Sequence, residues 1–183
     1  DAPRGRVLPL DLTLVDEGRL LGPRRSGRLY PVGASPDDWD TTRDPTVLVH
    51  GLKAGPGDMA TIARTLAGAG RQIYAYCYDD RRTRTQRCGE QLATELRWLP
   101  VKILGGGRTL RIIAHSMGGL VARAALNELA AGHYRGIERY GSVHLLAIDT
   151  PWHGFGGPSD SGGDRVLMDL VRPFMEDGLE DMR

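Results

Sequence analysis

The chain is poor in the features that mark several specialised classes of protein. It has two cysteines, two phenylalanines and a formal net charge of +1. Two cysteines are too few for a disulfide-rich scaffold, and the balanced charge argues against a nucleic-acid-binding surface. A membrane-spanning helix needs ~18 or more consecutive apolar residues, and the sequence contains no such run. What is left is an ordinary globular domain.

The amount of chain fits one such domain. With 183 residues, of which 40% are hydrophobic, a single core can form, and we expect residues 1–183 to make one domain. The sequence opens at Asp1 without an initiator methionine or a signal peptide. A removed targeting segment or a processing boundary would explain that start, and we expect an exported, extracytoplasmic protein.

The two cysteines, Cys77 and Cys88, flank a loop of ten residues. A disulfide between them would suit an extracytoplasmic enzyme. Two ordinary thiols, one on a strand and one at the start of a helix, fit the spacing equally well. Neither cysteine has a partner at metal-ligand spacing, so we expect no metal site.

Hydrophobic periodicity divides the chain into alternating strands and helices. The expected strands cover 8–14, 28–32, 46–51, 72–78, 109–113 and 142–148. Pro31 places the second of them at a sheet edge. The expected helices cover 58–69, 85–99 and the stretch from 117 to a stop at Gly132, with Asp58 as a cap and Pro100 as a bend or end. This order indicates an α/β protein with a mostly parallel sheet and helices on both faces.

The most informative segment is A-H-S-M-G at 114–118, between an apolar strand and a helix rich in small residues. It matches the nucleophile-elbow pattern G-x-S-x-G, with Ala114 in place of the first glycine. Small residues flank Ser116 in this pattern because the incoming strand and the outgoing helix nearly touch at the turn. The turn would expose the Ser116 hydroxyl at the carboxyl edge of the sheet.

Two further motifs accompany the elbow in a fixed order. V-L-V-H-G-L at 47–52 ends a strand in a His-Gly pair, and D-T-P-W-H-G at 149–154 follows the strand after the elbow. Together the three motifs resemble the α/β-hydrolase superfamily, specifically its lipase and esterase branch, over about 46–154. Trp152 departs from the T-P-H-x-G pattern of that branch, because it is inserted before the histidine.

The resemblance implies specific roles for four residues. Ser116 would be the nucleophile, and the backbone amides of Leu52 and Met117 would form an oxyanion hole. Asp149 follows a strand directly, where some lipases place the catalytic carboxylate. Alternatively, Asp149 is a turn residue whose side chain bonds the backbone of Thr150 and Pro151. No metal or organic cofactor is implied.

A catalytic histidine is harder to place, because no histidine lies beyond His153. In the family the base follows the acid, yet the position of His153 usually packs a loop. His50 and His115 fall at structural positions of the motifs. We expect His144 to be buried in its strand and His133 to lie on a loop away from the site.

The family's sheet normally continues with two more strands, which residues 149–183 do not predict. We therefore expect the chain to be a piece of a larger enzyme, completed by further chain or by a second chain. Residues 155–183 contain an amphipathic stretch from Asp164 to Phe174. This stretch is either a lid over the serine or an ordinary helix that covers the sheet.

The predicted function is hydrolysis of a carboxylic ester by a serine nucleophile. We expect a lipid or small ester as the substrate, transient contact with a lipid surface as an open alternative, and no nucleic acid as a partner. An acyltransferase would use the same elbow. A non-catalytic hydrolase-fold subunit or binding domain is the alternative from another class, since the base is missing.

Overall fold

The computed structural model of the chain describes residues 26–32, 43–102, 107–132 and 140–152. It contains five strands, and these are β1 (Arg28–Pro31), β2 (Pro45–Val49), β3 (Gln72–Cys77), β4 (Arg108–His115) and β5 (Tyr140–Ile148). The helical elements are a 3₁₀ turn η3 (Pro56–Met59) and the helices α1 (Ala60–Gly68), α2 (Thr85–Lys102) and α3 (Met117–Ala130). The N-terminal strand expected over 8–14 and the segment 155–183 lie outside the described residues.

The strands form one sheet in the order β1-β3-β2-β4-β5. β3, β2, β4 and β5 are parallel to one another, while β1 pairs antiparallel with β3 at one edge. The prediction of an α/β fold with a mostly parallel sheet is therefore confirmed. β1 is the outermost strand of the described sheet on this side, which agrees with the expectation for 28–32, and Pro31 lacks the amide that a central strand needs.

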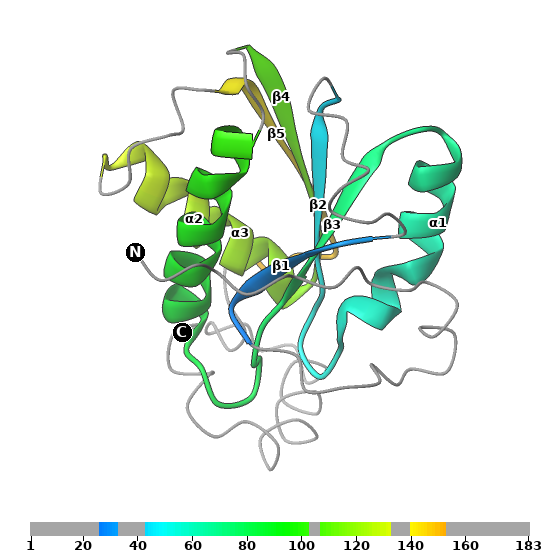
Figure 1. Ribbon diagram of the computed structural model, residues 1–183. Coiled ribbons are helices and arrows are strands. Elements are labelled where there is room, and N and C mark those ends of the chain that lie inside the picture. The colour runs from blue at the N-terminus through cyan, green and yellow to red at the C-terminus, as the bar shows by residue number, and fades with distance from the viewer. Residues whose placement is uncertain (1–25, 33–42, 103–106, 133–139, 153–183) are drawn as a thin grey trace.

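Helices cover both faces of this sheet (Figure 1). α2 and α3 lie side by side on one face and share the larger core cluster with β2, β3 and β4. α1 lies on the other face, where Ala60 and Ala63 pack against Leu48 and Ile73. β2 is buried along its whole length, since it is central and covered on both sides. Its carboxyl end, and that of β4, are thereby fixed in place.

Three details of the predicted elements are wrong. Asp58 does not cap α1. It lies within the preceding 3₁₀ turn, where its Oδ2 accepts the Gly55 amide at 2.7 Å. α2 continues through Pro100 to Lys102 instead of ending there. β5 is only partly buried, with Leu146 58% exposed and His144 exposed. The cause is its position, because β5 is the outermost strand of the described sheet and has a neighbour on one side only.

Candidate active site

Ser116 occupies the sharp turn between β4 and α3. Its backbone has φ 53° and ψ −127°, a conformation that costs an ordinary residue ~1–3 kcal/mol and that recurs at functional sites. The turn is held from two sides. The Ser116 amide donates to the carbonyl oxygen of Ile148 at 2.8 Å, and the Gly119 amide donates to the Ser116 carbonyl oxygen at 3.0 Å. The Ser116 side chain is half-buried, which leaves it open to a substrate.

The His-Gly loop after β2 packs directly against this turn. A β-carbon built on Gly51 would lie 3.1 Å from the Ser116 Cβ and 3.1 Å from the His115 Nδ1. A β-carbon on Gly118 would collide with the carbonyl oxygens of His50 and Val49. Position 118 therefore requires glycine, because backbone occupies the space where a side chain would lie, and a side chain at position 51 would be crowded by His115 and Ser116. The sequence motifs at 47–52 and 114–118 form one structural unit.

This packing places two backbone amides beside the serine. Met117 is the first residue of α3, so its amide has no partner within the helix. The Leu52 amide donates no hydrogen bond to any other described residue. One amide follows Ser116 and the other follows Gly51, which contacts Ser116. These two amides are the groups that the predicted oxyanion hole would use.

The loop at 50–53, which contains Gly51 and Leu52, packs against buried side chains that follow β3. The His50 ring is 1% exposed and stacks on the Tyr78 ring with centroids 4.2 Å apart. The Tyr78 hydroxyl donates to the His50 carbonyl oxygen at 2.6 Å. Buried Asp80 accepts the backbone amide of Lys53, and Lys53 has a positive φ of 56°. These contacts fix the loop on both sides of Gly51 and Leu52.

Burial also sets the protonation of His50. Removal from water lowers the pKa of this imidazole below its usual value, although the bond to the Gly51 carbonyl oxygen and the charges of Asp80 and Asp58 oppose the shift. The neutral ring places Nδ1 2.9 Å from the Gly51 oxygen. Its Nε2 finds no hydrogen-bond partner within the described part of the chain. His50 is therefore a buried packing group, as its motif position predicted.

Asp149 follows β5 at the same edge of the sheet as Ser116. Its φ of 50° is positive and its side chain is exposed. The next residue, Thr150, packs against the first turn of α3, where a β-carbon on Gly119 would collide with its side chain. The two predicted catalytic residues thus follow adjacent strands, and the Ser116–Ile148 hydrogen bond joins those strands just before Asp149.

The remaining histidines do not converge on Ser116 within the described residues. His115 is exposed beside the nucleophile, and His144 is exposed in the middle of β5, so the prediction that His144 is buried is wrong. An edge strand leaves such a side chain uncovered. His133 and His153 lie outside the described residues.

The sequence reasoning missed two residues that support the site. Asp80 belongs to the polar segment D-D-R-R at 79–82, which is typical of a solvated loop, yet it is 7% exposed. Sequence reasoning assigns Tyr78 no role beyond its strand. A carboxylate directly after a buried strand was the available signal for Asp80, and the phenol of Tyr78 gave none. Cys77 and Cys88 are free thiols, which favours the second of the two alternatives for them.

In the described part of the chain, no helix is both long and apolar enough to cross a bilayer. No group of three or more metal-ligating side chains gathers there either.

A mostly parallel sheet, a strand–serine–helix turn at its carboxyl edge and a glycine loop packed on that turn define an α/β-hydrolase fold. The comparison with family models agrees. The chain belongs to the family described as "Putative serine esterase (DUF676)", whose model matches residues 44–167. No curated protein matches the sequence.

Solved structures of lipases share the fold. The chain is similar to the mature form of the lipase BlEst2 from Bacillus licheniformis, with a TM-score of 0.58 and 20% identity over 87% of this chain and 62% of that one. It is also similar to lipase B of Aspergillus fumigatus, with a TM-score of 0.52 and 16% identity over 68% of this chain and 29% of that one. The chain thus spans less than two thirds of either lipase.

Proposed function

We propose that this chain carries the nucleophile and the oxyanion hole of a serine esterase that cleaves carboxylic esters, with lipid esters as the preferred class. The observation that carries the proposal is the strained turn at Ser116, packed against Gly51 so that the Leu52 and Met117 amides flank the hydroxyl. Membership of a serine-esterase family supports the same activity. The lipases of the same fold support the preference for lipid esters.

The reaction follows from this geometry in two halves. Ser116 Oγ attacks the ester carbonyl carbon while a base takes its proton, and the carbonyl oxygen becomes an oxyanion between the two amides. Each such donor contributes ~3 kcal/mol to stabilising the transition state in studied enzymes. The intermediate collapses, the alcohol leaves with the proton, and an acyl-enzyme remains on Ser116. Water then attacks the acyl carbon and releases the acid.

The base and its partner complete the proposal. We assign the base to a histidine outside the described residues, either His153 or one in further chain. We assign the orienting carboxylate to Asp149, which lies one residue beyond the strand that holds the Ser116 amide. A carboxylate at this edge could accept the Nδ1 proton of the base and stabilise its cationic form.

Labelling with a fluorophosphonate, followed by intact-protein mass spectrometry, tests the activation of Ser116. We expect one adduct on the wild-type protein and none on Ser116→Ala. Ser142→Ala is the matched control, because its hydroxyl only bonds Thr109 Oγ1 at 2.9 Å, and it should label like the wild type. An unlabelled wild-type protein that is folded by circular dichroism would overturn the proposal and leave the binding-domain alternative.

A series of p-nitrophenyl esters from acetate to palmitate tests the substrate class. If lipid esters are preferred, kcat/KM rises with acyl length, and Ser116→Ala abolishes the reaction at every length. A maximum at acetate would refute the lipid preference while leaving the esterase proposal in place.

A further inference from the structure

A polar pocket lies between the first turn of α2 and residues 120–127 of α3. These two helices cover one face of the sheet (Figure 1). It has a volume of about 370 Å³ and is lined by Thr85, Gln86, Leu120, Arg123, Ala124 and Asn127. None of these six residues has a role in the proposed esterase reaction. We call it the α2–α3 pocket.

The two helices approach each other closely at Ala124, which is one of the residues that line this pocket. A β-carbon built on Gly89 of α2 would lie 3.0 Å from the backbone nitrogen of Ala125 and even closer to the Ala124 side chain. Because Gly89 has no side chain, α2 can approach α3 at this point. The first turn of α2 is thereby brought opposite the middle of α3.

The α2 side of the pocket presents the positive end of a helix. α2 has 18 residues and begins at Thr85, so its first amides have no partner within the helix and favour an anion. Thr85 itself is only 6% exposed. Its hydroxyl oxygen is buried and makes no hydrogen bond to any of the described residues. A buried hydroxyl without a partner is a group whose hydrogen bonding a bound oxygen atom would complete.

The α3 side of the pocket supplies a cation and an amide. The Arg123 guanidinium lies over the Trp152 ring, 5.4 Å from its centroid, and forms no ion pair with the described carboxylates. Asn127 follows one turn later on the same helix. The nearby carboxylate of Glu128 does not line the pocket, and it accepts a hydrogen bond from Gln86 Nε2 at 2.9 Å.

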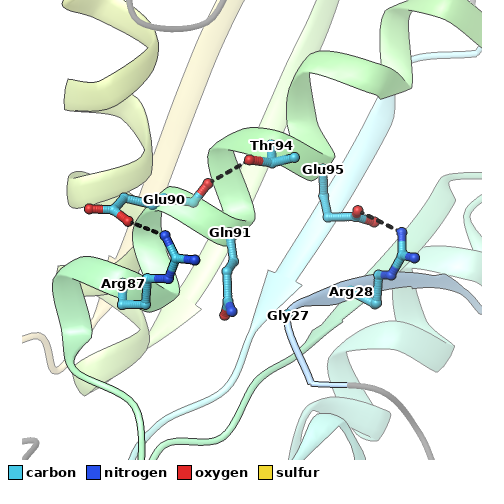
Figure 2. Close-up of a pocket in the computed structure, with 7 residues that line it drawn as sticks. All are labelled: Gly27, Arg28, Arg87, Glu90, Gln91, Thr94 and Glu95. Carbon is cyan, nitrogen blue, oxygen red and sulfur yellow. Dashed lines mark hydrogen bonds and ion pairs between the residues drawn. The ribbon is translucent and has the colours of Figure 1, made fainter. Parts of the chain in front are cut away.

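Another pocket along α2 differs from the α2–α3 pocket in how its cations are paired. Figure 2 shows that pocket, in which Arg28 pairs with Glu95 at 3.2 Å and Arg87 pairs with Glu90 at 2.7 Å. Its cations are therefore matched by carboxylates of the same pocket. The α2–α3 pocket instead has a cation and a helix N-terminus, and none of the described residues that line it is a carboxylate.

We propose that the α2–α3 pocket binds a phosphate group, held by Arg123, the buried Thr85 hydroxyl and the first amides of α2. Arginine and a helix N-terminus together give charge-assisted bonds to phosphate oxygens. The Thr85 hydroxyl donates a further bond. The phosphate belongs either to a soluble phosphate compound or to a phospholipid headgroup, which present the same oxygens to the protein. The inference does not depend on esterase activity.

Isothermal titration calorimetry with inorganic phosphate tests the site. We expect saturable binding by the wild type and at least a ~10-fold rise in Kd for Arg123→Gln, as for loss of one charge-assisted contact. Arg64→Gln removes the same charge from an exposed position on α1, and its Kd should stay at the wild-type value. Binding by all three proteins with equal Kd, or no saturation below ~10 mM phosphate, overturns the proposal.

Thr85→Val separates binding from folding. The change keeps the shape of the side chain but removes a hydroxyl that has no partner among the described residues. The free protein should therefore unfold at the same temperature as the wild type or higher, while its Kd for phosphate rises ~3- to 10-fold. An unchanged Kd contradicts the role of Thr85 in the site.

Vesicle sedimentation distinguishes the two sources of the phosphate. If a phospholipid supplies it, vesicles of phosphatidylglycerol sediment the wild type and Arg64→Gln but not Arg123→Gln. If a soluble compound supplies it, none of the three proteins sediments while the wild type still binds inorganic phosphate. Either pattern supports the phosphate site.

Discussion

The Tyr78 hydroxyl donates a hydrogen bond of 2.6 Å to the carbonyl oxygen of His50, and the two rings stack 4.2 Å apart. This contact joins the end of β3 to the residue that precedes the Gly51–Leu52 loop. Because the proposed oxyanion donor is the Leu52 amide, the phenol acts on the site through the backbone. Substitution of the residues that hold this loop should therefore affect the proposed reaction, as substitution of Ser116 would.

Replacement of Tyr78 by Phe removes that hydrogen bond and leaves a buried carbonyl oxygen without a donor. We expect the free energy of unfolding to fall by ~1–3 kcal/mol in urea denaturation. If the protein hydrolyses esters, kcat should fall while KM changes little, because an oxyanion donor acts in the transition state. A matched Tyr74→Phe variant loses the hydrogen bond from the Gln72 side chain but leaves the bond to the His50 carbonyl oxygen in place, and its kcat should not change.

Replacement of Gly118 by Ala places a methyl group against the carbonyl oxygens of His50 and Val49. Backbone cannot give way as a side chain can, so we expect a loss of ~1–3 kcal/mol in the free energy of unfolding. Gly68→Ala is the control, because nothing lies within 4 Å of its added carbon and Gly68 ends a helix. That variant should be neutral or slightly stabilised. Equal effects of the two changes would contradict the close packing at the elbow.

The lowered pKa of His50 predicts a pH-dependent stability. The buried ring resists protonation, whereas the same ring in the unfolded chain takes up a proton near its model value of 6.5. The free energy of unfolding should thus fall as the pH drops below 6.5 and level off beneath the folded-state pKa. Each pH unit of that window is worth about 1.4 kcal/mol.

His50→Phe keeps the stack on Tyr78 but removes the titration. Between pH 7.5 and 5, the free energy of unfolding of the wild type should fall relative to that of this variant as the pH falls. Parallel profiles would show that His50 is not the group responsible.

Asp44 gives the opposite kind of test, at acid pH. A hydrogen bond from Arg111 at 2.8 Å, together with the Thr109 amide, lowers the pKa of this carboxyl below its usual value, against a smaller effect of burial. Its stabilising effect is present above the ordinary pKa of 3.8 and is lost as the pH falls through the folded-state pKa.

Asp44→Asn should therefore be less stable than the wild type by up to ~1 kcal/mol at pH 7, since the ion pair is partly exposed. The difference should vanish once the pH is below the folded-state pKa, when the carboxyl is protonated in both states. Glu90→Gln breaks the more exposed pair with Arg87 and should change stability by less than ~0.5 kcal/mol. A difference at Asp44 that persists unchanged in acid would contradict the assignment.

The mostly parallel sheet could be predicted from the sequence because buried parallel strands are continuous apolar runs. Val47, Leu48 and Val49 are at most 1% exposed, as their run predicted. The turn at Ser116 could also be predicted, since small residues on both sides of a serine have a steric cause. β5 could not be placed at an edge in this way, because its sequence is as apolar as that of a central strand.

The supporting contacts of the site were beyond sequence reasoning for another reason. Tyr78 and Asp80 act on the His50–Lys53 loop across 27 or 28 positions of the chain, and no local pattern encodes such a pair. The close approach of Gly89 to Ala124 is equally non-local. The spacing of apolar residues along the chain predicts which residues face inward. Contacts between elements depend on how the helices pack against the sheet and against each other.

The hydrogen bond from the Ser116 amide to the Ile148 carbonyl oxygen links the turn at Ser116 to local opening of β5. β5 is the outermost strand of the described sheet, so it can detach in a local opening that leaves β2, β3 and β4 paired. Such an opening would release the Ser116 amide to solvent. Hydrogen exchange at this single amide therefore reports the detachment of β5, and the nucleophile would lose its geometry well before the core unfolds.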